Sequence, residues 1–470
     1  MPNNDFSNNF ERYTQCYSYV GVFRNKDSTK FDYSEASQGK FLTGITSFVE
    51  YIEIENSIDM AFRVGKIGIN DIADVRKVLP LMGNEIIYIE YNNVITAQAT
   101  VSTNKKGFFR IMGIEESKDD FNSSRSSKTT SRHLTLFLAE FPYVDILTFN
   151  GYNKSYTWGA GTASKAPGGT ASISRIVNDM FTDSMTRNNI NNNGISLYIQ
   201  PTSDVTPQDR FNYYSPNWSI LKNINFLKRF ALSRNGNYSY YYLNCEQDKI
   251  TFQSAYTNYL DKINRNKNRI EFVPLEISSL IPFYDISPAD ATNTLMDVNF
   301  KYGNAIDGMF SGFSGETFFS FDYYNGHKFD AYDYRLFKQE TPSNDKYFIN
   351  YQKFGDQSNK MSYSPFTVGS LNQNLKKYEY SKKSFNSMIC EATAFVNNSR
   401  YLGQSANIVL PPSSQTTKNL IDPILGANWC IWGYKDVISA NTGICKITLK
   451  KDSTDIPYSG MAETMLPATS

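Results

Sequence analysis

Histidine is nearly absent from this chain of 470 residues, which contains only His133 and His327. Histidine is the commonest general base in enzymes and a common metal ligand. Its scarcity removes most hydrolase and metalloenzyme mechanisms. No other arrangement of residues predicts catalysis, so we expect no enzymatic activity, no cofactor and no bound metal.

The cysteines exclude a second group of proteins. There are five, an odd number, and no two of them are spaced C-x-x-C in this long chain. These features argue against a disulfide framework and against a zinc site. We expect reduced, mostly buried thiols in a protein made in a cytosol, at Cys16, Cys245, Cys390, Cys430 and Cys445.

The chain also lacks long apolar runs and carries almost no net charge. The segment that begins at Met1 has no basic and no apolar stretch, and no run approaches the roughly 20 apolar residues that span a bilayer. The net charge is +1. We therefore expect no signal peptide, no membrane segment and no bulk attraction to nucleic acid.

Aromatic residues are abundant, with 33 Tyr and 33 Phe. Aromatic side chains favour pleated, half-buried surfaces, which predicts a protein dominated by β-strands. Hydrophobic residues make up 40% of the chain and charged residues 20%, which is enough apolar material for real cores and excludes a disordered scaffold. The length predicts two to four domains.

The first region, 1–120, has the pattern of a small antiparallel unit. Ile52 and Ile54 alternate with glutamates, as in a half-buried strand. A turn or short helix is expected over 71–79. Short strands at this spacing predict a barrel or sandwich, with further members at 65–69, 85–91, 94–101 and 108–114.

The second region, 121–265, predicts a mixed α/β domain. A polar linker leads to a strand over 133–141, and apolar residues at helical spacing predict helices over 172–180 and after residue 217. Asn217 or Ser215 is the expected N-cap of the second helix. A strand pair follows at 238–243 and 250–253, with a turn at 246–248.

The third region contains a hairpin signal. Asn325-Gly326 lies between strand-like runs at 317–324 and 327–332. Two closing strands are expected at 424–434 and 444–449. We assign 266–337 and 401–455 to one domain, interrupted by an insertion over 338–400 that contains a helix at 384–396. Residues 456–470 are expected to form a tail.

Two lysine pairs flank predicted strands, Lys105-Lys106 and Lys450-Lys451. Such pairs usually form a solvated edge that prevents aggregation. They could instead give a positive lining to a channel that conducts DNA. The glycine-rich residues 159–161 and 168–169 lack the spacing of a phosphate-binding loop and indicate a flexible connection.

Two tryptophans stand three residues apart in a predicted strand, Trp429 and Trp432. That spacing places them on opposite sides of the strand. One of them could be buried at a contact between subunits.

Several blocks, in order along about 400 residues, resemble one family. Residues 48–58 are similar to its opening strand, 65–71 to a "G-x-hydrophobic-x-hydrophobic-x-D" segment, and 79–87 to its "L-P-x-x-G-x-E" turn. Residues 215–231 resemble its helix, although Ser219 stands near the place of a second proline. The blocks 238–243, 251–254, 308–310, 321–322, 329–337, 407–411, 425–429 and 447–453 follow. The family is the central hub of contractile-tail baseplates of T-even-type phages, related to the hub half of type VI secretion spike proteins.

The resemblance implies a mainly β fold with an α/β insert. Two pseudo-repeated antiparallel β-barrels would be joined by the mixed α/β domain, with an insertion in the C-terminal half. A trimer would then present six similar barrels in a ring. Such a ring joins a sixfold tail tube to a threefold spike, surrounds the central channel, and needs no catalytic residue. Residues expected at its interfaces are Trp429, Trp432, Tyr332 and Tyr334.

The same resemblance implies the partners and the location. We expect self-association as a homotrimer and contacts with the central spike protein, the tail tube or tube-initiator protein, baseplate wedge proteins and the tape-measure protein. DNA would only pass through the channel. The protein would reside in the tail baseplate of a virion assembled in the host cytoplasm.

Two other functions stay open. The Tyr, Trp and Asn content also suits a carbohydrate-binding or adhesin module of a tail tip, which would be monomeric and carry exposed aromatic rings. A tail-associated cell-wall hydrolase would need opposed carboxylates or a Cys/His pair in a pocket. The mass in solution separates the hub from the first, and hydrolysis of peptidoglycan separates it from the second.

Overall fold

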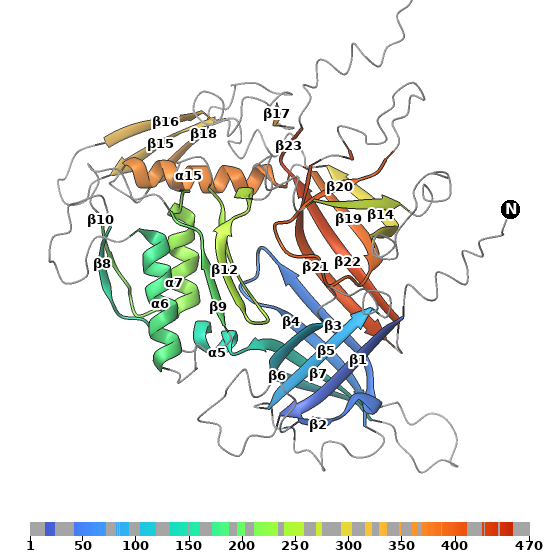
Figure 1. Ribbon diagram of the computed structural model, residues 1–470. Helices are drawn as coiled ribbons and strands as arrows, with labels where there is room; N and C mark the ends of the chain where they lie inside the picture. Colours follow the sequence, from blue (N-terminus) through green and yellow to red (C-terminus); the bar gives the residue numbers. More distant parts are fainter. Residues whose placement is uncertain are drawn as a thin grey trace, which may run out of the picture.

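The computed structural model of the chain contains one large sheet, a mixed α/β part and smaller sheets (Figure 1). The residues that it describes are 15–23, 42–71, 81, 83, 85–93, 104–118, 132–148, 151–158, 172–187, 195–202, 211–233, 239–257, 269–274, 293–302, 315–321, 329–335, 347–348, 360–364, 369–386, 388–410, 425–426, 428–439 and 442–454.

The first half of the large sheet contains seven described strands in the order β2-β1-β5-β6-β7-β4-β3. Their inward side chains alternate with outward ones, as in β7, where Leu134, Leu136 and Leu138 are buried in the core that also holds Ile52 and Ile54. This is the period-two pattern of a sheet with one covered face. The strands are β1 (Cys16–Phe23), β2 (Leu42–Gly44), β3 (Val49–Ser57, after the 3₁₀ turn η1, Thr46–Phe48), β4 (Val64–Asn70), β5 (Ile86–Asn93), β6 (Lys105–Lys118) and β7 (Arg132–Phe141).

The second half contains six strands whose hydrogen-bonded pairings form a closed ring. Strand β22 pairs with both β19 and β21, and the order continues through β20, β13 and β14 back to β19. Their shared core includes Phe272, Cys390, Ile408 and Leu449. The strands are β13 (Ile270–Pro274), β14 (Thr294–Tyr302), β19 (Met388–Phe395), β20 (Ser405–Ile408), β21 (Trp429–Ser439) and β22 (Thr442–Lys451).

One strand pair makes the two halves a single sheet. Strands β3 and β21 are antiparallel from Ser57 opposite Gly433 to Tyr51 opposite Ser439. We call this pair the seam. Every other pair of named strands in the described part of the large sheet lies within one half. One isolated bridge, Gln15 opposite Thr442, also joins the two halves.

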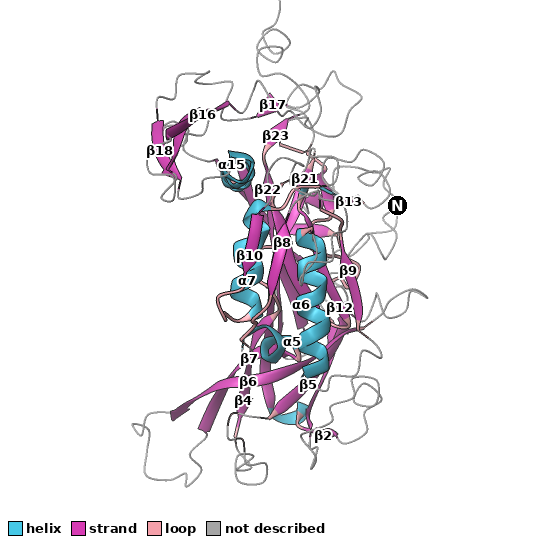
Figure 2. Ribbon diagram, turned by 90° about the vertical axis from the view of Figure 1, so that its left-hand side faces the viewer, coloured by secondary structure: helices cyan, strands magenta, loops and turns pink. Residues whose placement is uncertain are grey.

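The α/β part packs three helices against a small sheet of order β11-β12-β9. Ile176, Ile224 and Phe252 belong to its core, and in both views α6 and α7 lie beside β9 and β12 (Figure 1, Figure 2). Its elements are α5 (Tyr143–Thr148), β8 (Ser155–Trp158), α6 (Ile173–Arg187), β9 (Ser196–Ile199), β10 (Phe211–Tyr214), α7 (Ile220–Leu227), the 3₁₀ turn η2 (Lys228–Phe230), β11 (Tyr241–Glu246) and β12 (Lys249–Ser254).

The N-cap of α7 differs from the prediction. The side chain of Ser219, not of Asn217 or Ser215, accepts a hydrogen bond from the Lys222 backbone N–H. Ser215 is buried and bonded to the Tyr152 carbonyl oxygen instead. The helix therefore begins later than the Pro216 entry suggested.

The remaining described elements lie outside the large sheet. Strands β15 (Gly315–Phe321), β16 (Phe329–Arg335) and β18 (Lys360–Ser364) form a separate sheet, β17 (Tyr347–Phe348) pairs with β23 (Ser453–Thr454), and α15 (Gly369–Ser384) runs across the α/β part (Figure 1). The predicted antiparallel pairing of the 317–332 hairpin is confirmed. The hairpin was assigned to the second barrel, but its described strands belong to the separate sheet and not to the large sheet.

Three other expectations need correction. The helix predicted over 384–396 is wrong, because α15 ends at Ser384 and β19 occupies Met388–Phe395. β19 lies inside the expected insertion, yet it pairs with β14 and β22. β7 was assigned to the α/β domain, yet it pairs with β4 and β6. Predictions for 72–79, 94–101, Asn325-Gly326, 159–169 and 456–470 lie outside the described residues.

Candidate functional site: a buried polar junction

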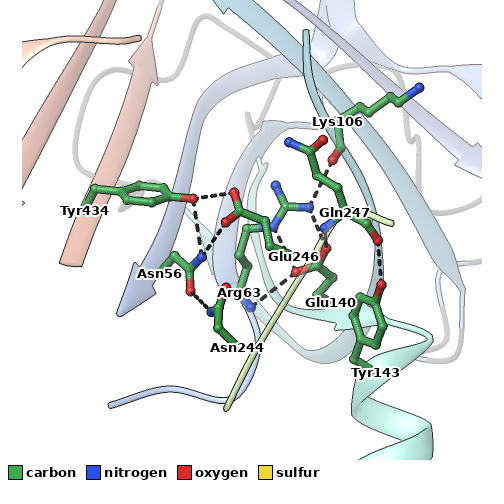
Figure 3. A network of polar contacts seen from close by, with 9 residues as sticks. All are labelled: Asn56, Arg63, Lys106, Glu140, Tyr143, Asn244, Glu246, Gln247 and Tyr434. Atoms are coloured by element: carbon green, nitrogen blue, oxygen red, sulfur yellow. Dashed lines mark hydrogen bonds and ion pairs between the residues drawn. The ribbon is translucent and has the colours of Figure 1, made fainter. Parts of the chain in front are cut away.

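Buried polar side chains meet where the seam touches the α/β part (Figure 3). Asn56, at the end of β3, donates from Nδ2 to Glu246 Oε2 at 3.0 Å and to the Tyr434 hydroxyl at 3.3 Å. Its Oδ1 accepts from Asn244 Nδ2 at 2.7 Å. The Tyr434 hydroxyl donates to Glu246 Oε1. These four side chains tie both sheet halves to strand β11.

A buried ion pair continues the junction. Arg63 and Glu140 are each 1% exposed or less, and the guanidinium donates from Nε to Oε2 at 2.8 Å and from Nη2 to Oε1 at 2.5 Å. Nη2 also donates to the Lys106 carbonyl oxygen at 3.0 Å. Gly107 leaves room for the guanidinium, since a Cβ there would stand 2.4 Å from Nη2. Such a bidentate pair fixes orientation as well as charge.

The β11–β12 turn is held by the same carboxylate. The Gln247 backbone N–H donates to Glu140 Oε1 at 2.6 Å, and the Tyr143 hydroxyl donates to the Gln247 carbonyl oxygen at 2.8 Å. Gln247 has a φ of 55°, in the left-handed region. Glu140 therefore links the first sheet half directly to the α/β part.

A second buried cluster crosses the interface of the two halves. Asp436 of β21 accepts from Lys105 Nζ at 2.9 Å and from the Tyr91 hydroxyl at 2.8 Å. The Lys105 ammonium also lies 3.9 Å from the centroid of the Tyr434 ring. Tyr434 thus belongs to both groups. We call Asn56, Arg63, Glu140, Asn244, Glu246, Gln247, Tyr434, Tyr91, Lys105 and Asp436 the junction.

Burial and neighbouring positive charge have opposite effects on the pKa values of the two buried carboxyl groups, Glu140 and Asp436. Burial raises the pKa of Glu140, and the Arg63 guanidinium opposes that rise. Burial also raises the pKa of Asp436, but Lys105 and the hydrogen bonds outweigh it, so the pKa lies below its usual range. Asp436 is therefore a carboxylate at neutral pH, and it holds the Lys105 ammonium inside the protein.

The chemistry of the junction is suited to a structural role, which is to hold neighbouring elements in a fixed arrangement. Its carboxylates are occupied by guanidinium, ammonium, hydroxyl and amide donors from other elements. Removing one partner of a buried pair leaves an uncompensated charge or donor, which is costly. The junction therefore selects one relative placement of the two halves and the α/β part.

The four lysines proposed for a channel lining do not behave alike. Lys105 is 2% and Lys451 0% exposed, so neither lines an open channel in this chain. Lys451 Nζ lies 5.7 Å from the centroid of the Trp429 ring. Lys106 is half-buried and Lys450 donates to Asn386 Oδ1 at 2.8 Å.

The tryptophan pair also lies inside the chain. Trp429 and Trp432 are 0% and 3% exposed. The Lys451 ammonium lies over the Trp429 ring and the Lys450 ammonium lies 4.4 Å from the centroid of the Trp432 ring. Because adjacent residues of a strand face opposite sides, these contacts agree with the expectation that the two tryptophans lie on opposite sides. A bulge between Ile431 and Gly433 interrupts the pairing of β21 with β22 at this point. Trp432 Nε1 donates to Asp59 Oδ2 at 2.8 Å. Tyr332 and Tyr334 stand on β16, whose side chains lie outside the described part.

The five cysteines are free and buried, as predicted. Burial raises the pKa of Cys16 and of Cys390 to about 12, so both are thiols at neutral pH. In the described part of the chain, no helix has the length and apolar character to cross a bilayer.

Apart from Lys105, the junction residues were missed from the sequence, although one signal marks two of them. Asn56 continues the inward row of Ile52 and Ile54, and Glu140 continues that of Leu134, Leu136 and Leu138. A polar residue at the next inward position of an apolar row must find a partner. The sequence does not tell which partner it finds, because Asn244 and Glu246 are 188 and 190 residues away from Asn56.

Comparisons with known proteins agree on the fold. No family model and no curated protein matches the sequence. The structure is similar to a tail protein from Neisseria meningitidis MC58, with TM-score 0.50, 9% identity, and coverage of 93% of this chain and 97% of that one. It is also similar to the 43 kDa tail protein of prophage MuSo2 from Shewanella oneidensis, with TM-score 0.51, 8% identity, and coverage of 92% and 98%.

The E. coli c3393 protein, a component of the type VI secretion system, gives a TM-score of only 0.42 at 10% identity, over 87% of this chain and 73% of that one. That value is too low to bear on the fold. The two tail proteins, matched over nearly their whole length, show that this chain has their fold.

Proposed function

We propose that this chain is a structural protein of a phage-type tail, and specifically the baseplate hub: a trimer that joins a sixfold tail tube to a threefold spike. The observation that supports a tail role is the fold shared with two tail proteins over more than nine-tenths of this chain and of each of theirs. The partners are then the spike, the tube and the wedge proteins around them. No catalytic step is part of this role.

The strand order supports the pseudo-repeat on which such an adaptor depends. We number six strands of each half in chain order, leaving out the three-residue β2. The first half, β1, β3, β4, β5, β6, β7, then reads 1-4-5-6-3-2 across the sheet. The second half, β13, β14, β19, β20, β21, β22, reads 1-4-5-6-3-2 around its circle of pairings.

The two halves differ in their first strand. β1 is antiparallel to β5, whereas β13 is parallel to β20. β13 also pairs with β14, whereas β1 contacts the segment that precedes β3 at Val20, whose carbonyl oxygen accepts from the Ile45 N–H at 2.8 Å. Five strands of a common unit are thus retained in order and direction, which suits two barrels derived from one repeat.

The outward face near the seam supports a water-filled channel. A polar groove of about 540 Å³ crosses β14, β19, β22, β21 and β3. Its lining contains four acids and three lysines. Two of them pair with charges beside the groove, since Glu391 Oε1 lies 2.6 Å from Lys301 Nζ and Lys435 Nζ lies 2.7 Å from Glu53 Oε2. A face of nearly balanced charges would let DNA pass without holding it. In this proposal the face replaces Lys105 and Lys451 as the channel lining.

Light scattering of the purified chain, alone and with its spike partner, tests the proposal. A hub gives three times the chain mass of 53.6 kDa. A chain that remains monomeric at high concentration and also with the spike contradicts the hub and favours a tail-tip module. Hydrolysis of peptidoglycan that one carboxylate substitution abolishes would instead reveal a hydrolase.

A further inference from the structure

The small sheet β11-β12-β9 has two chemically different faces. On one face Leu243, Ile250 and Phe252 belong to the helix-covered core. The other face carries polar residues in register, with Tyr242 opposite Gln253. A half-covered sheet normally leaves such a face in open solvent.

Here the polar face is largely withdrawn from solvent. Tyr242, Asn244 and Gln253 are only 2%, 7% and 8% exposed. They form the floor of a cleft of about 430 Å³, and its opposite wall is the segment 398–402, which joins β19 to β20 in the second sheet half. Ligand pockets range from roughly 300 to 1,000 Å³. The cleft is therefore large enough for a small ligand.

The floor of the cleft keeps unused bonding capacity. Gln253 Nε2 donates to the Tyr242 hydroxyl at 2.6 Å, which donates to the Leu402 carbonyl oxygen at 3.2 Å. Gln253 Oε1 accepts no hydrogen bond from any residue that the structure describes. Gly403 allows the loop to approach, because a Cβ there would stand 2.8 Å from the Tyr242 hydroxyl oxygen. The amide oxygen is thus fixed in place and able to accept from a ligand.

The charges of the cleft lining cancel. Its two acids are Glu246 and Asp248, and its two bases are Lys249 and Arg400. Arg400 is 3% exposed and already donates to the Phe395 carbonyl oxygen at 2.8 Å. A site for phosphate would show an excess of cations, and a site for a metal ion an excess of carboxylates. The balance favours a neutral ligand.

An exposed aromatic ring stands at the rim. Tyr198 of β9 lies in register with Thr251 and is 45% exposed. Its ring lies 5.6 Å from the Lys249 ammonium. A rigid ring beside amides and carboxylates offers an apolar surface for C–H groups and polar groups for hydroxyls.

We propose that this cleft binds a neutral saccharide of one or two rings. The Tyr198 ring packs against the C–H face of the sugar, and Gln253 and Asn244 bind its hydroxyl groups. The site adds binding of a cell-surface or cell-wall glycan to a structural protein. It does not depend on the hub role, since the cleft lies wholly within one chain.

The test uses the full chain on a panel of immobilised oligosaccharides that includes neutral, sialylated and phosphorylated members. The neutral oligosaccharide bound best is then titrated in solution by calorimetry. Tyr198→Ala should weaken its binding about tenfold or more, because the stacking surface is lost. Tyr198→Phe should retain the affinity, and Gln253→Ala should reduce it.

Tyr214→Ala is the matched control, since Tyr214 is a 67% exposed tyrosine of the same α/β part outside the cleft lining. Tyr214→Ala should bind the oligosaccharide like the wild type. All four variants should have thermal unfolding midpoints within a few degrees of the wild-type value. Absence of binding to the whole panel, preference for phosphorylated members, or equal affinity in Tyr198→Ala would overturn the proposal.

Discussion

At the scale of single residues, stability depends on polar groups that have no access to water. Tyr434 is the clearest case, because its hydroxyl reaches Glu246 and Asn56 while its ring lies under the Lys105 ammonium. Burial raises its pKa well above the usual value, so it stays a hydrogen-bond donor at any physiological pH.

Tyr434→Phe keeps the ring and removes the hydroxyl. Glu246 then loses a buried donor, and we expect the free energy of unfolding to fall by about 1–3 kcal/mol. Thermal unfolding of the purified variant measures this. The control is Tyr214→Phe, an exposed position where no change is expected. Equal midpoints for both variants would show that the hydroxyl contributes nothing to the junction.

Asp436→Asn tests the second cluster through pH. The pKa of Asp436 is lowered in the folded protein, so its stabilisation is complete above the unfolded pKa of about 4 and is lost as the pH falls toward the folded pKa. At pH 7 the variant leaves Lys105 without its counter-charge, and we expect a loss of about 3–5 kcal/mol. The difference from the wild type should shrink below about pH 4.

Unfolding midpoints of both proteins between pH 3 and 7 give the comparison, and Asp297→Asn, at an exposed position of β14, is the control. A difference that stays constant over this range would mean that the carboxylate charge is not what stabilises the cluster.

At the scale of elements, β3 to β7 were predictable from the sequence, whereas β1, β2 and several strands of the second half were not. Alternation in β3 and β7 is carried by Ile and Leu against Glu and Thr, a contrast visible in the sequence. In β19 the inward residues include Cys390, Ala392 and Ala394, which are small, and alanine also favours helices. Pairing with β14 and β22 overrides that local preference.

The junction and the cleft were less predictable than the strands. Both depend on contacts between segments far apart in the chain, such as Asn56 with Glu246 or Tyr242 with Leu402. The sequence around a polar residue shows that the residue is present, but it does not identify the distant partner with which it forms a hydrogen bond. Trp432 shows the same limit, because Asp59, which accepts the hydrogen bond from its indole N–H, lies 373 residues away in the chain.

Glycines make close strand approach possible in the first half. A Cβ on Gly65 of β4 would stand 2.6 Å from the Glu53 carbonyl oxygen of β3, an atom fixed by the strand pair. Gly65→Ala should therefore destabilise the protein by about 1–3 kcal/mol. Gly113→Ala on β6 is the control, since its nearest neighbour would be 3.7 Å away. Hydrogen exchange of β3 and β4 amides should rise only in Gly65→Ala, and unchanged protection there would refute the argument.

At the scale of the whole molecule, one chain holds two sheet halves with a common strand order, fixed to each other by the seam and the junction. A chain built this way presents two similar units at a set angle. In the proposed trimer, three copies would offer six units, which is the geometry required where sixfold and threefold assemblies meet. The saccharide cleft lies at the boundary of the α/β part and the second half, within each copy.

The most direct measurement is an electron cryomicroscopy map of the assembled tail. The hub account predicts three copies around the tail axis between tube and spike, with both sheet halves of each copy in one ring and their polar outward face turned to the channel. A map that places the chain at the periphery, or as single copies away from the axis, would contradict it.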